Sequence, residues 1–287
     1  MRVLTLKNMG TLPYGAEEAL NRLRVNFGFC GKDYKKVVIT SSTPDEGKSF
    51  VAAQLWRMLA EAGNKVILVD ADLRKSVIRN RYEISGEDEQ GTRYGLAYYL
   101  AGQAELEETI YATNIENGFM VPTFQTVSNP AILLQNDRFS VMLDQLAKVF
   151  DYVLVDTPPL SNVSDGELIA SLCDGALLVI RSGVTPRSLV ANSIKQLEHA
   201  NCKLMGTVLN RVQKEQSTYY TKYSKYGYGY GYGYGYGYGN DGEEKKLSRR
   251  KGHSSHGSKS GKASKPGKAS KPAETSESEN PETSAKE

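Results

Sequence analysis

Short apolar runs alternate with longer amphipathic stretches over roughly the first 210 residues of the chain. The runs are apolar at consecutive positions, which is typical of strands that are covered on both faces of a sheet. They predict strands at Lys36–Ser41, Lys65–Asp70, Gly118–Pro122, Tyr152–Asp156, Ala176–Arg181 and Leu204–Asn210. The stretches between them predict helices near Lys48–Ala62, Asn129–Val149, Asp165–Leu172 and Thr185–Ala200. This alternation indicates an α/β domain with a doubly wound, mostly parallel sheet and helices on both faces.

Tyrosine dominates the pattern after this domain. The chain has 18 Tyr but only 7 Phe and 1 Trp, and from Tyr226 to Gly239 tyrosine and glycine alternate strictly. Ten tyrosines fall within twenty residues: Tyr219, Tyr220, Tyr223, Tyr226, Tyr228, Tyr230, Tyr232, Tyr234, Tyr236 and Tyr238. Core packing alone does not favour the hydroxylated ring so strongly, so we expect this cluster to have another purpose.

The remaining residues, 240–287, consist almost entirely of Ser, Lys, Gly, Pro and Glu. They contain 11 Lys and Arg against 8 Asp and Glu, so they account for the whole formal charge of +3. The stretch lacks the apolar residues that offset ordering entropy, and we expect it to be disordered. The acidic end argues against a nucleic-acid partner, and we expect none.

Targeting features are absent from the pattern. No run of roughly 18 apolar residues could span a bilayer, and the N-terminus has no apolar core of a secretory signal. The three cysteines have neither the number of a disulfide framework nor the spacing of a zinc site. A cytoplasmic protein is therefore expected.

The segment after the first predicted strand has the spacing of a phosphate-binding loop. It reads S-T-P-D-E-G-K-S over Ser42–Ser49, with a strand before it and a helix after it. In such a loop backbone N–H groups cradle phosphate oxygens, the lysine reaches the β- and γ-phosphates, and the hydroxyl that follows ligates magnesium. The predicted nucleotide-binding residues are Thr43, Pro44, Asp45, Glu46, Gly47, Lys48 and Ser49.

Three carboxylates follow predicted strands. Asp70 and Asp72 come at the end of one strand, and Asp156 comes at the end of another. Ligands of open α/β sheets bind at the carboxyl ends of the strands. Each Asp alone could be a helix cap or a turn residue, but together with the loop the three favour a magnesium-nucleotide site.

These motifs, together with G-T-V-L-N-R-V at the last strand and the tyrosine cluster, resemble the bacterial tyrosine kinases (BY-kinases) of the split, Gram-positive type. The resemblance covers residues from about 14 to 238. It implies a P-loop fold, ATP and Mg²⁺ as cofactors, and four parts: an N-terminal extension with an oligomerisation helix (1–35), the kinase domain (36–216), the autophosphorylated tyrosine cluster (217–239) and the tail (240–287).

The resemblance also implies a role for each site residue. Lys48 would neutralise the phosphates, while Ser49, Asp72 and Asp156 would hold the metal or its waters. Asp70 would be the catalytic base for the tyrosine hydroxyl. Asn210 would contact the adenine base, unless it is only a strand-end cap. The tyrosine cluster would be the substrate of a neighbouring subunit, although a low-complexity spacer or a self-associating segment is the alternative.

A further part of the resemblance lies in the first predicted helix, at Tyr14–Asn26. Glu17, Glu18, Arg22, Arg24 and Asn26 resemble the E-x-x-R-x-x-R-T-N oligomerisation motif of the family, with Asn21 and Val25 as departures. An ordinary amphipathic helix is the alternative.

Association at this helix would close a ring of identical subunits. The other partners implied are a membrane-embedded activator that governs polysaccharide chain length, and a phosphotyrosine phosphatase. The enzyme would then regulate capsular or exopolysaccharide synthesis and lie at the inner face of the plasma membrane.

Two other classes share some of these features. Partition and division-site ATPases carry the acidic strands but also a second lysine in the loop, at the position of Thr43 here. A regulator without catalysis would not need Lys48 and the three carboxylates. The tyrosine cluster and Thr43 favour the kinase.

Overall fold

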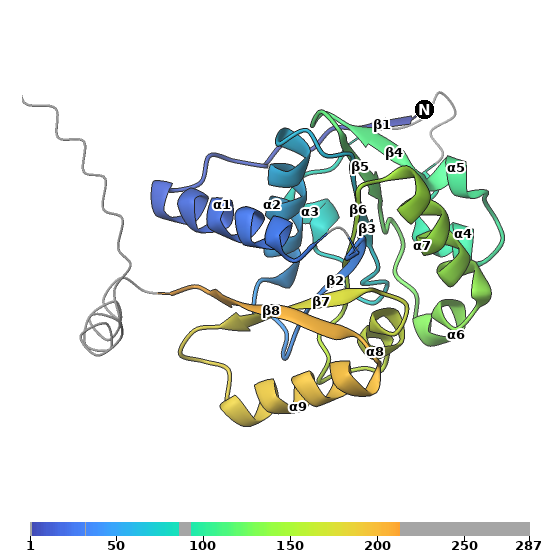
Figure 1. Cartoon of the computed structure of the whole chain (residues 1–287). Helices are drawn as coiled ribbons and strands as arrows, with labels where there is room; N and C mark the ends of the chain where they lie inside the picture. The colour runs from blue at the N-terminus through green and yellow to red at the C-terminus, as the bar shows by residue number, and fades with distance from the viewer. Residues whose placement is uncertain (1, 32, 86–92, 213–287) are drawn as a thin grey trace, which may run out of the picture. The chain divides into compact units, whose positions relative to one another are not determined.

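The computed structural model describes residues 2–31, 33–85 and 93–212, which form a sheet with helices on both faces (Figure 1). The eight strands of this part run in the spatial order β1-β4-β5-β3-β6-β2-β7-β8. All neighbouring strands are parallel except β4 and β5. The strands are β1 (Arg2–Leu4), β2 (Lys36–Ser41), β3 (Val66–Asp70), β4 (Tyr111–Thr113), β5 (Gly118–Val121), β6 (Tyr152–Asp156), β7 (Gly175–Arg181) and β8 (Lys203–Asn210).

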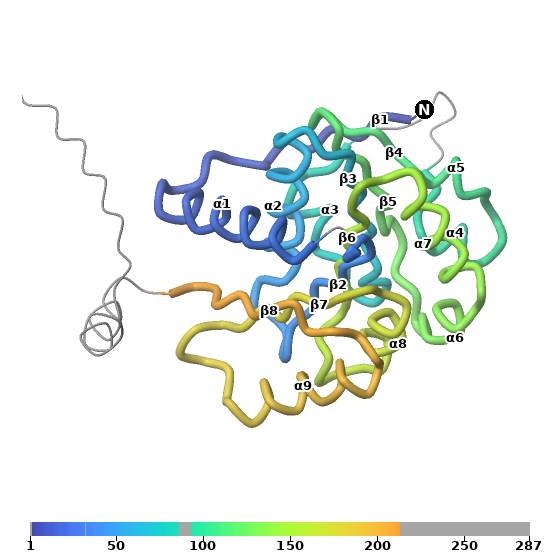
Figure 2. The backbone as a smooth tube through the Cα atoms, in the orientation of Figure 1, coloured from blue at the N-terminus to red at the C-terminus, as the bar shows by residue number. Residues whose placement is uncertain are grey.

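The helices divide between the two faces, as the backbone tube shows (Figure 2). One face carries α1 (Tyr14–Phe29), α2 (Lys48–Glu61) and α3 (Ile78–Arg81). The other carries α4 (Leu96–Leu100), α5 (Leu106–Thr109), α6 (Pro130–Leu134), α7 (Asp137–Val149), α8 (Asp165–Ala170) and α9 (Arg187–His199). Two apolar cores result, one on each side of the sheet.

The central strands contribute to both cores because successive side chains point to opposite faces. In β3, Ile67 and Val69 pack in the core with α7, whereas Val66 and Leu68 pack in the core with α2. The consecutive apolar residues of the sequence therefore mark strands that are covered twice, and the predicted fold class is confirmed.

The fold differs from the prediction in three ways: one predicted helix is two, two strands were not predicted, and the short helices α3, α4 and α5 were not predicted either. The helix expected over Asn129–Val149 is two helices, α6 and α7, because the chain adopts an extended conformation at Asn136. The Asn136 side chain caps α7 by accepting a hydrogen bond from the N–H of Arg138 at 3.1 Å. The strands β1 and β4, of three residues each, were not predicted. The tyrosine cluster and the tail at 240–287 lie outside the described residues.

Candidate active site

The register of the parallel sheet brings the predicted site residues to one edge. Asp70 at the end of β3 is paired with Asp156 at the end of β6, and β6 in turn pairs with β2, which leads into the phosphate-binding loop. Asp72 follows two residues after β3, and Lys48 is the first residue of α2. Residues that are more than 100 positions apart in the sequence thus meet at the carboxyl ends of adjacent strands.

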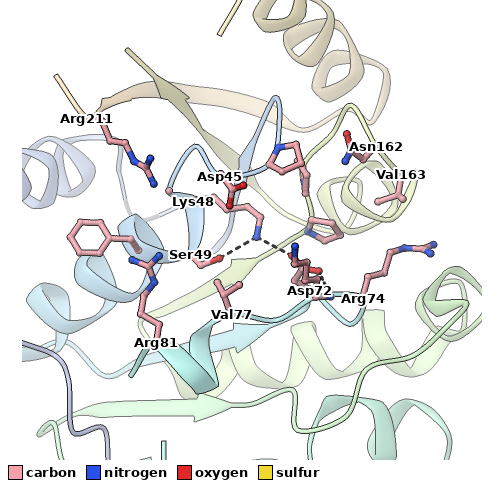
Figure 3. Close-up of a pocket in the computed structure, with 16 residues that line it drawn as sticks. Asp45, Lys48, Ser49, Asp72, Arg74, Val77, Arg81, Asn162, Val163 and Arg211 are labelled. Carbon is pink, nitrogen blue, oxygen red and sulfur yellow. Dashed lines mark hydrogen bonds and ion pairs between the residues drawn. The ribbon is translucent and has the colours of Figure 1, made fainter. Parts of the chain in front are cut away.

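Lys48 is the centre of this arrangement (Figure 3). Its Nζ atom lies 3.0 Å from Asp72 Oδ2, 3.7 Å from Asp156 Oδ1 and 3.1 Å from Ser49 Oγ. Burial lowers the pKa of Lys48, but the charges of Asp156 and Asp72 outweigh that effect and raise the pKa above its ordinary value. The ammonium group therefore stays charged, as a phosphate-binding lysine must.

Asp70 lies beneath the cleft, with 1% of its surface exposed. The hydroxyl of Ser76 donates a hydrogen bond to Asp70 Oδ2, while Oδ1 has no hydrogen-bond partner among the described residues. Burial, together with the charge of Asp156, raises the pKa of Asp70 to about 8. A carboxyl group with this pKa can exchange a proton near neutral pH.

Asp156 is also buried, and its Oδ1 likewise has no hydrogen-bond partner within the described part of the chain. Burial raises the pKa of Asp156 to about 6 in spite of the nearby Lys48. Two buried carboxylate oxygens that accept no hydrogen bond, on adjacent strands, suit a divalent cation or its water ligands.

The donor set also matches the way in which Mg²⁺ is bound in nucleotide sites. Among the described residues no group of three or more His, Cys, Asp and Glu could hold a metal ion by itself. Mg²⁺ usually takes one or two carboxylates, several waters and phosphate oxygens of the substrate rather than a cage made of protein alone. Ser49, Asp72 and Asp156 are placed to supply the protein part of such a shell.

A cleft of about 310 Å³ opens above these residues. Of the predicted residues, Pro44, Asp45, Gly47, Lys48, Ser49 and Asp72 line it. In Figure 3, Arg74 and Asp72 lie on one side of Lys48, and Arg81 and Arg211 lie on the other. The lining residues that the prediction missed are Phe50, Arg74, Lys75, Val77, Arg81, Pro158, Pro159, Asn162, Val163 and Arg211.

Arg74 and Ser76 are the missed residues that touch the predicted site most directly. The Arg74 guanidinium forms a two-pronged ion pair with the buried Asp165, at 2.6 and 3.1 Å, which ties the turn after β3 to the start of α8. Arg74 follows Asp72 by two residues in D-A-D-L-R, and this short spacing could have been used to predict that Arg74 lies at the site. Ser76 had no such signal, because only the folded turn directs its hydroxyl at Asp70.

Three predicted nucleotide-binding residues do not line the cleft. Thr43 donates its backbone N–H to the Glu46 carboxylate at 2.9 Å, and the Glu46 side chain is 1% exposed. The Asn210 amide donates to the backbone carbonyl of Glu46 at 2.9 Å and accepts from the N–H of Arg211 at 2.9 Å. In this structure Asn210 thus holds the loop at the end of β8.

The residues of the predicted oligomerisation motif lie on α1, and two of its glutamates have different partners. Glu17 pairs with Arg57 of α2 at 3.1 Å, within the same chain. Within the described residues Glu18 pairs with Arg22 one turn along α1, at 3.2 Å, and the side chains of Arg22 and Glu18 are 76% and 44% exposed. Arg22 and Asn26 are exposed and Arg24 is half-buried.

Comparison with known proteins assigns the chain to a family. A family model described as an AAA domain matches residues 35–205. The chain is 39% identical over 211 residues to the tyrosine-protein kinase CpsD of Streptococcus agalactiae, an alignment that covers 74% of this chain and 90% of that protein. The chain belongs to the bacterial tyrosine kinase family. It is a tyrosine-protein kinase, as predicted.

Solved structures agree with this assignment. The kinase domain of the Escherichia coli tyrosine kinase ETK superimposes with a TM-score of 0.64 and 32% identity, over 76% of this chain and 80% of that one. The septum site-determining protein MinD from Pyrococcus horikoshii, solved with Mg-ADP, gives a TM-score of 0.55 and 25% identity over 63% and 71% of the two chains. Both neighbours share the P-loop fold of this kinase, and their likeness implies that it binds ATP together with a metal.

No helix in the described parts of this kinase is long and apolar enough to cross a membrane.

Proposed function

We propose that this kinase transfers the γ-phosphate of ATP to the tyrosine cluster, residues 217–239, of a neighbouring copy of the same chain. The observation that carries the proposal is the convergence of Lys48, Asp70, Asp72 and Asp156 on one cleft in a chain that also contains ten clustered tyrosines. In this proposal residues 36–216 are the kinase domain, residues 1–35 contain the oligomerisation helix and residues 240–287 are an accessory tail.

The cleft supplies positive charge and backbone donors for the phosphates. Lys48 reaches the β- and γ-phosphates, and the N–H groups of the loop and of the first turn of α2 face their oxygens. Ser49, Asp72 and Asp156 would hold Mg²⁺ or its waters. The bound ion would supply the charge that neutralises the phosphate oxygens as the bond to ADP breaks.

Asp70 is the proposed base. An ordinary tyrosine has a pKa of about 10, and an ordinary Asp, with a pKa near 3.9, accepts its proton poorly. The burial that raises the pKa of Asp70 to about 8 narrows this gap. Because Asp70 is covered, we expect the turn that contains Ser76 to move before the acceptor hydroxyl can reach Oδ1.

The tyrosine cluster is suited to entering a site on another chain. Glycine between tyrosines removes side-chain obstruction and leaves the backbone free, so successive hydroxyls can be presented in turn. Each phosphate adds about −1.5 to −2 charges, and repulsion between phosphorylated clusters would weaken the assembly.

Assembly is proposed to use α1, which exposes Arg22 and Asn26, and in part Glu18, together with apolar side chains. Tyr14 is 85% and Phe29 is 81% exposed, although both are large hydrophobic residues. A ring built through this surface would bring the cluster of one subunit to the cleft of the next.

The MinD-like neighbour supports a second candidate function, an ATPase switch that dimerises around the nucleotide without phosphorylating anything.

In the cell the kinase is proposed to regulate capsular or exopolysaccharide synthesis. A membrane-embedded activator would hold it at the inner face of the plasma membrane, and a phosphatase would remove the phosphates. The names of the CpsD relatives support the link to tyrosine phosphorylation, and the polysaccharide role follows from the family resemblance.

The decisive test fuses the cytoplasmic end of the activator to this chain, adds ATP and Mg²⁺, and maps phosphotyrosine by mass spectrometry. We expect phosphate on tyrosines between residues 219 and 238. Hydrolysis of ATP without any phosphotyrosine would favour the ATPase switch and refute the proposal.

A further inference from the structure

Glu46 is a carboxylate inside the phosphate-binding loop that faces away from the cleft. It precedes Gly47, and only 1% of its surface is exposed. Its Oε2 atom accepts a hydrogen bond from the N–H of Thr43 at 2.9 Å. Its Oε1 atom accepts from the hydroxyl of Thr185 and, at 3.4 Å, from the N–H of Arg181. One side chain thus connects the loop with the turn between β7 and α9.

The chemistry of these contacts requires a group that only accepts hydrogen bonds. All three partners of the Glu46 carboxylate are donors, two backbone N–H groups and one hydroxyl. An ionised carboxylate accepts at both oxygens, whereas an amide must turn an NH₂ group toward one of them. No Lys or Arg within the described residues forms an ion pair with Glu46. The three hydrogen-bond donors therefore offset the free-energy cost of burying the carboxylate.

We infer that Glu46 is a positioning residue for nucleotide binding, and that Thr185 is its anchor outside the loop. The carboxylate fixes the distance between the Thr43 end of the loop and the turn after β7, and so holds the loop N–H groups in the arrangement that receives phosphate. The inference rests on the nucleotide site of the proposed function. Neither Glu46 nor Thr185 lines the cleft, so both act through the loop backbone.

The test measures binding of a fluorescent ADP with Mg²⁺ to the full chain, and the ATP dependence of tyrosine phosphorylation by the activator fusion. Glu46→Gln should weaken ADP binding and raise KM for ATP about tenfold, as expected for the loss of one charge-assisted hydrogen bond. Thr185→Val should weaken binding about threefold, and Thr185→Ser should restore it. For each variant kcat at saturating ATP should stay within about threefold of wild type, because the reacting groups are untouched.

A double-mutant cycle tests whether Glu46 and Thr185 affect ADP binding through the hydrogen bond between them. If Glu46 and Thr185 act as one unit, the combined variant should bind ADP no more weakly than Glu46→Gln alone. Glu198→Gln, on the exposed face of α9, is the matched control and should bind as wild type does. Should Glu46→Gln fail to fold, Thr185→Val, which keeps the carboxylate, carries the test.

Three results would overturn the inference: wild-type ADP affinity in Thr185→Val, additive effects in the double variant, or a loss of kcat with KM unchanged. Failure of the wild-type chain to bind ADP would instead refute the nucleotide site itself. The two failures are therefore distinguishable.

Discussion

Lys48 decides the charge balance of the cleft at the scale of single residues, because its ammonium lies between Asp72 and Asp156. Lys48→Met would leave both carboxylates without their cation and the phosphates without a preorganised donor. We expect phosphotyrosine formation to fall by about 10²–10³-fold or more. Lys195→Met, an exposed change on α9, is the control and should keep wild-type activity. Near-normal labelling of Lys48→Met would contradict the role of this lysine.

Asp70 gives a prediction about pH and stability. Its folded-state pKa of about 8 lies above the ordinary value of 3.8, so between these values the folded protein binds more protons than the unfolded chain. The contribution of Asp70 to the free energy of unfolding is therefore present at low pH and is lost as pH rises through about 8. Asp70→Asn lacks this group and should lose less stability between pH 5 and pH 9 than the wild type does.

The measurement is urea unfolding of both proteins in EDTA, which keeps the site free of metal. Asp156, whose pKa is raised to about 6, adds a loss of the same sign to both proteins, so the comparison isolates Asp70. The same pH dependence in both would show that Asp70 does not carry the raised pKa.

Motif spacing predicted which residues meet, but not where each side chain points. Lys48, Ser49 and Asp72 line the cleft, and Asp70 and Asp156 are buried beneath it. Side chains on strands alternate between faces, so the approximate place of these carboxylates follows from the sequence. Loop residues have no such period, which is why the sequence could not show that Glu46 turns inward.

The phosphate-binding loop and β8 depend on each other at the scale of elements. Gly47 has a φ of +96°, and a Cβ atom there would lie 2.1 Å from the Asn210 side-chain nitrogen. Gly47→Ala should therefore displace Asn210 and weaken ADP binding at least tenfold. Gly63→Ala has a similar φ of +88° but no atom within 4 Å of its Cβ, so it should lose stability without losing ADP binding. Equal ADP affinity in the two variants would contradict this coupling.

The first helix gives a prediction that separates the packing of α1 on its own chain from the association of α1 with a neighbouring chain. Glu17 pairs with the nearly buried Arg57, so Glu17→Ala should lower the free energy of unfolding by about 1 kcal/mol. The partner of Glu18 in the described part of the chain is the exposed Arg22, so Glu18→Ala should leave stability within about 0.5 kcal/mol of wild type but dissociate the oligomer. Urea unfolding and light scattering after size-exclusion chromatography measure the two effects. An intact oligomer in Glu18→Ala would contradict assembly through α1.

Elements that carry a long pattern were predicted well, and short ones were not. The six predicted strands are confirmed with ends within one residue. The central strands β2, β3 and β6 are covered on both faces and leave continuous apolar runs, whereas β8 lies at the edge of the sheet and has no buried residue. The strands β1 and β4 have three residues each, too few to show any period. The break between α6 and α7 depends on a local cap at Asn136. The residues on both sides of it remain amphipathic, so the hydrophobic pattern does not mark the break.

At the scale of the whole molecule, one chain contains both the kinase cleft and the tyrosine cluster that is its proposed substrate. The described residues build the cleft, and the tyrosine cluster follows in sequence after β8. The sequence predicts the tyrosine cluster only as a composition, because glycine at every second position leaves the backbone without a preferred conformation. Its proposed role as substrate depends on a neighbouring chain, which the sequence of one chain does not describe.

Transfer between chains is the central claim, and mixing two defective variants tests it most directly. Lys48→Met keeps the tyrosine cluster but lacks the phosphate-binding lysine, and a version truncated after Gln216 keeps the cleft but lacks the cluster. With both fused to the activator and supplied with ATP and Mg²⁺, we predict phosphotyrosine on the Lys48→Met chain in the mixture and none when it is alone. An unlabelled Lys48→Met chain in the mixture, while wild type labels itself, would contradict the account.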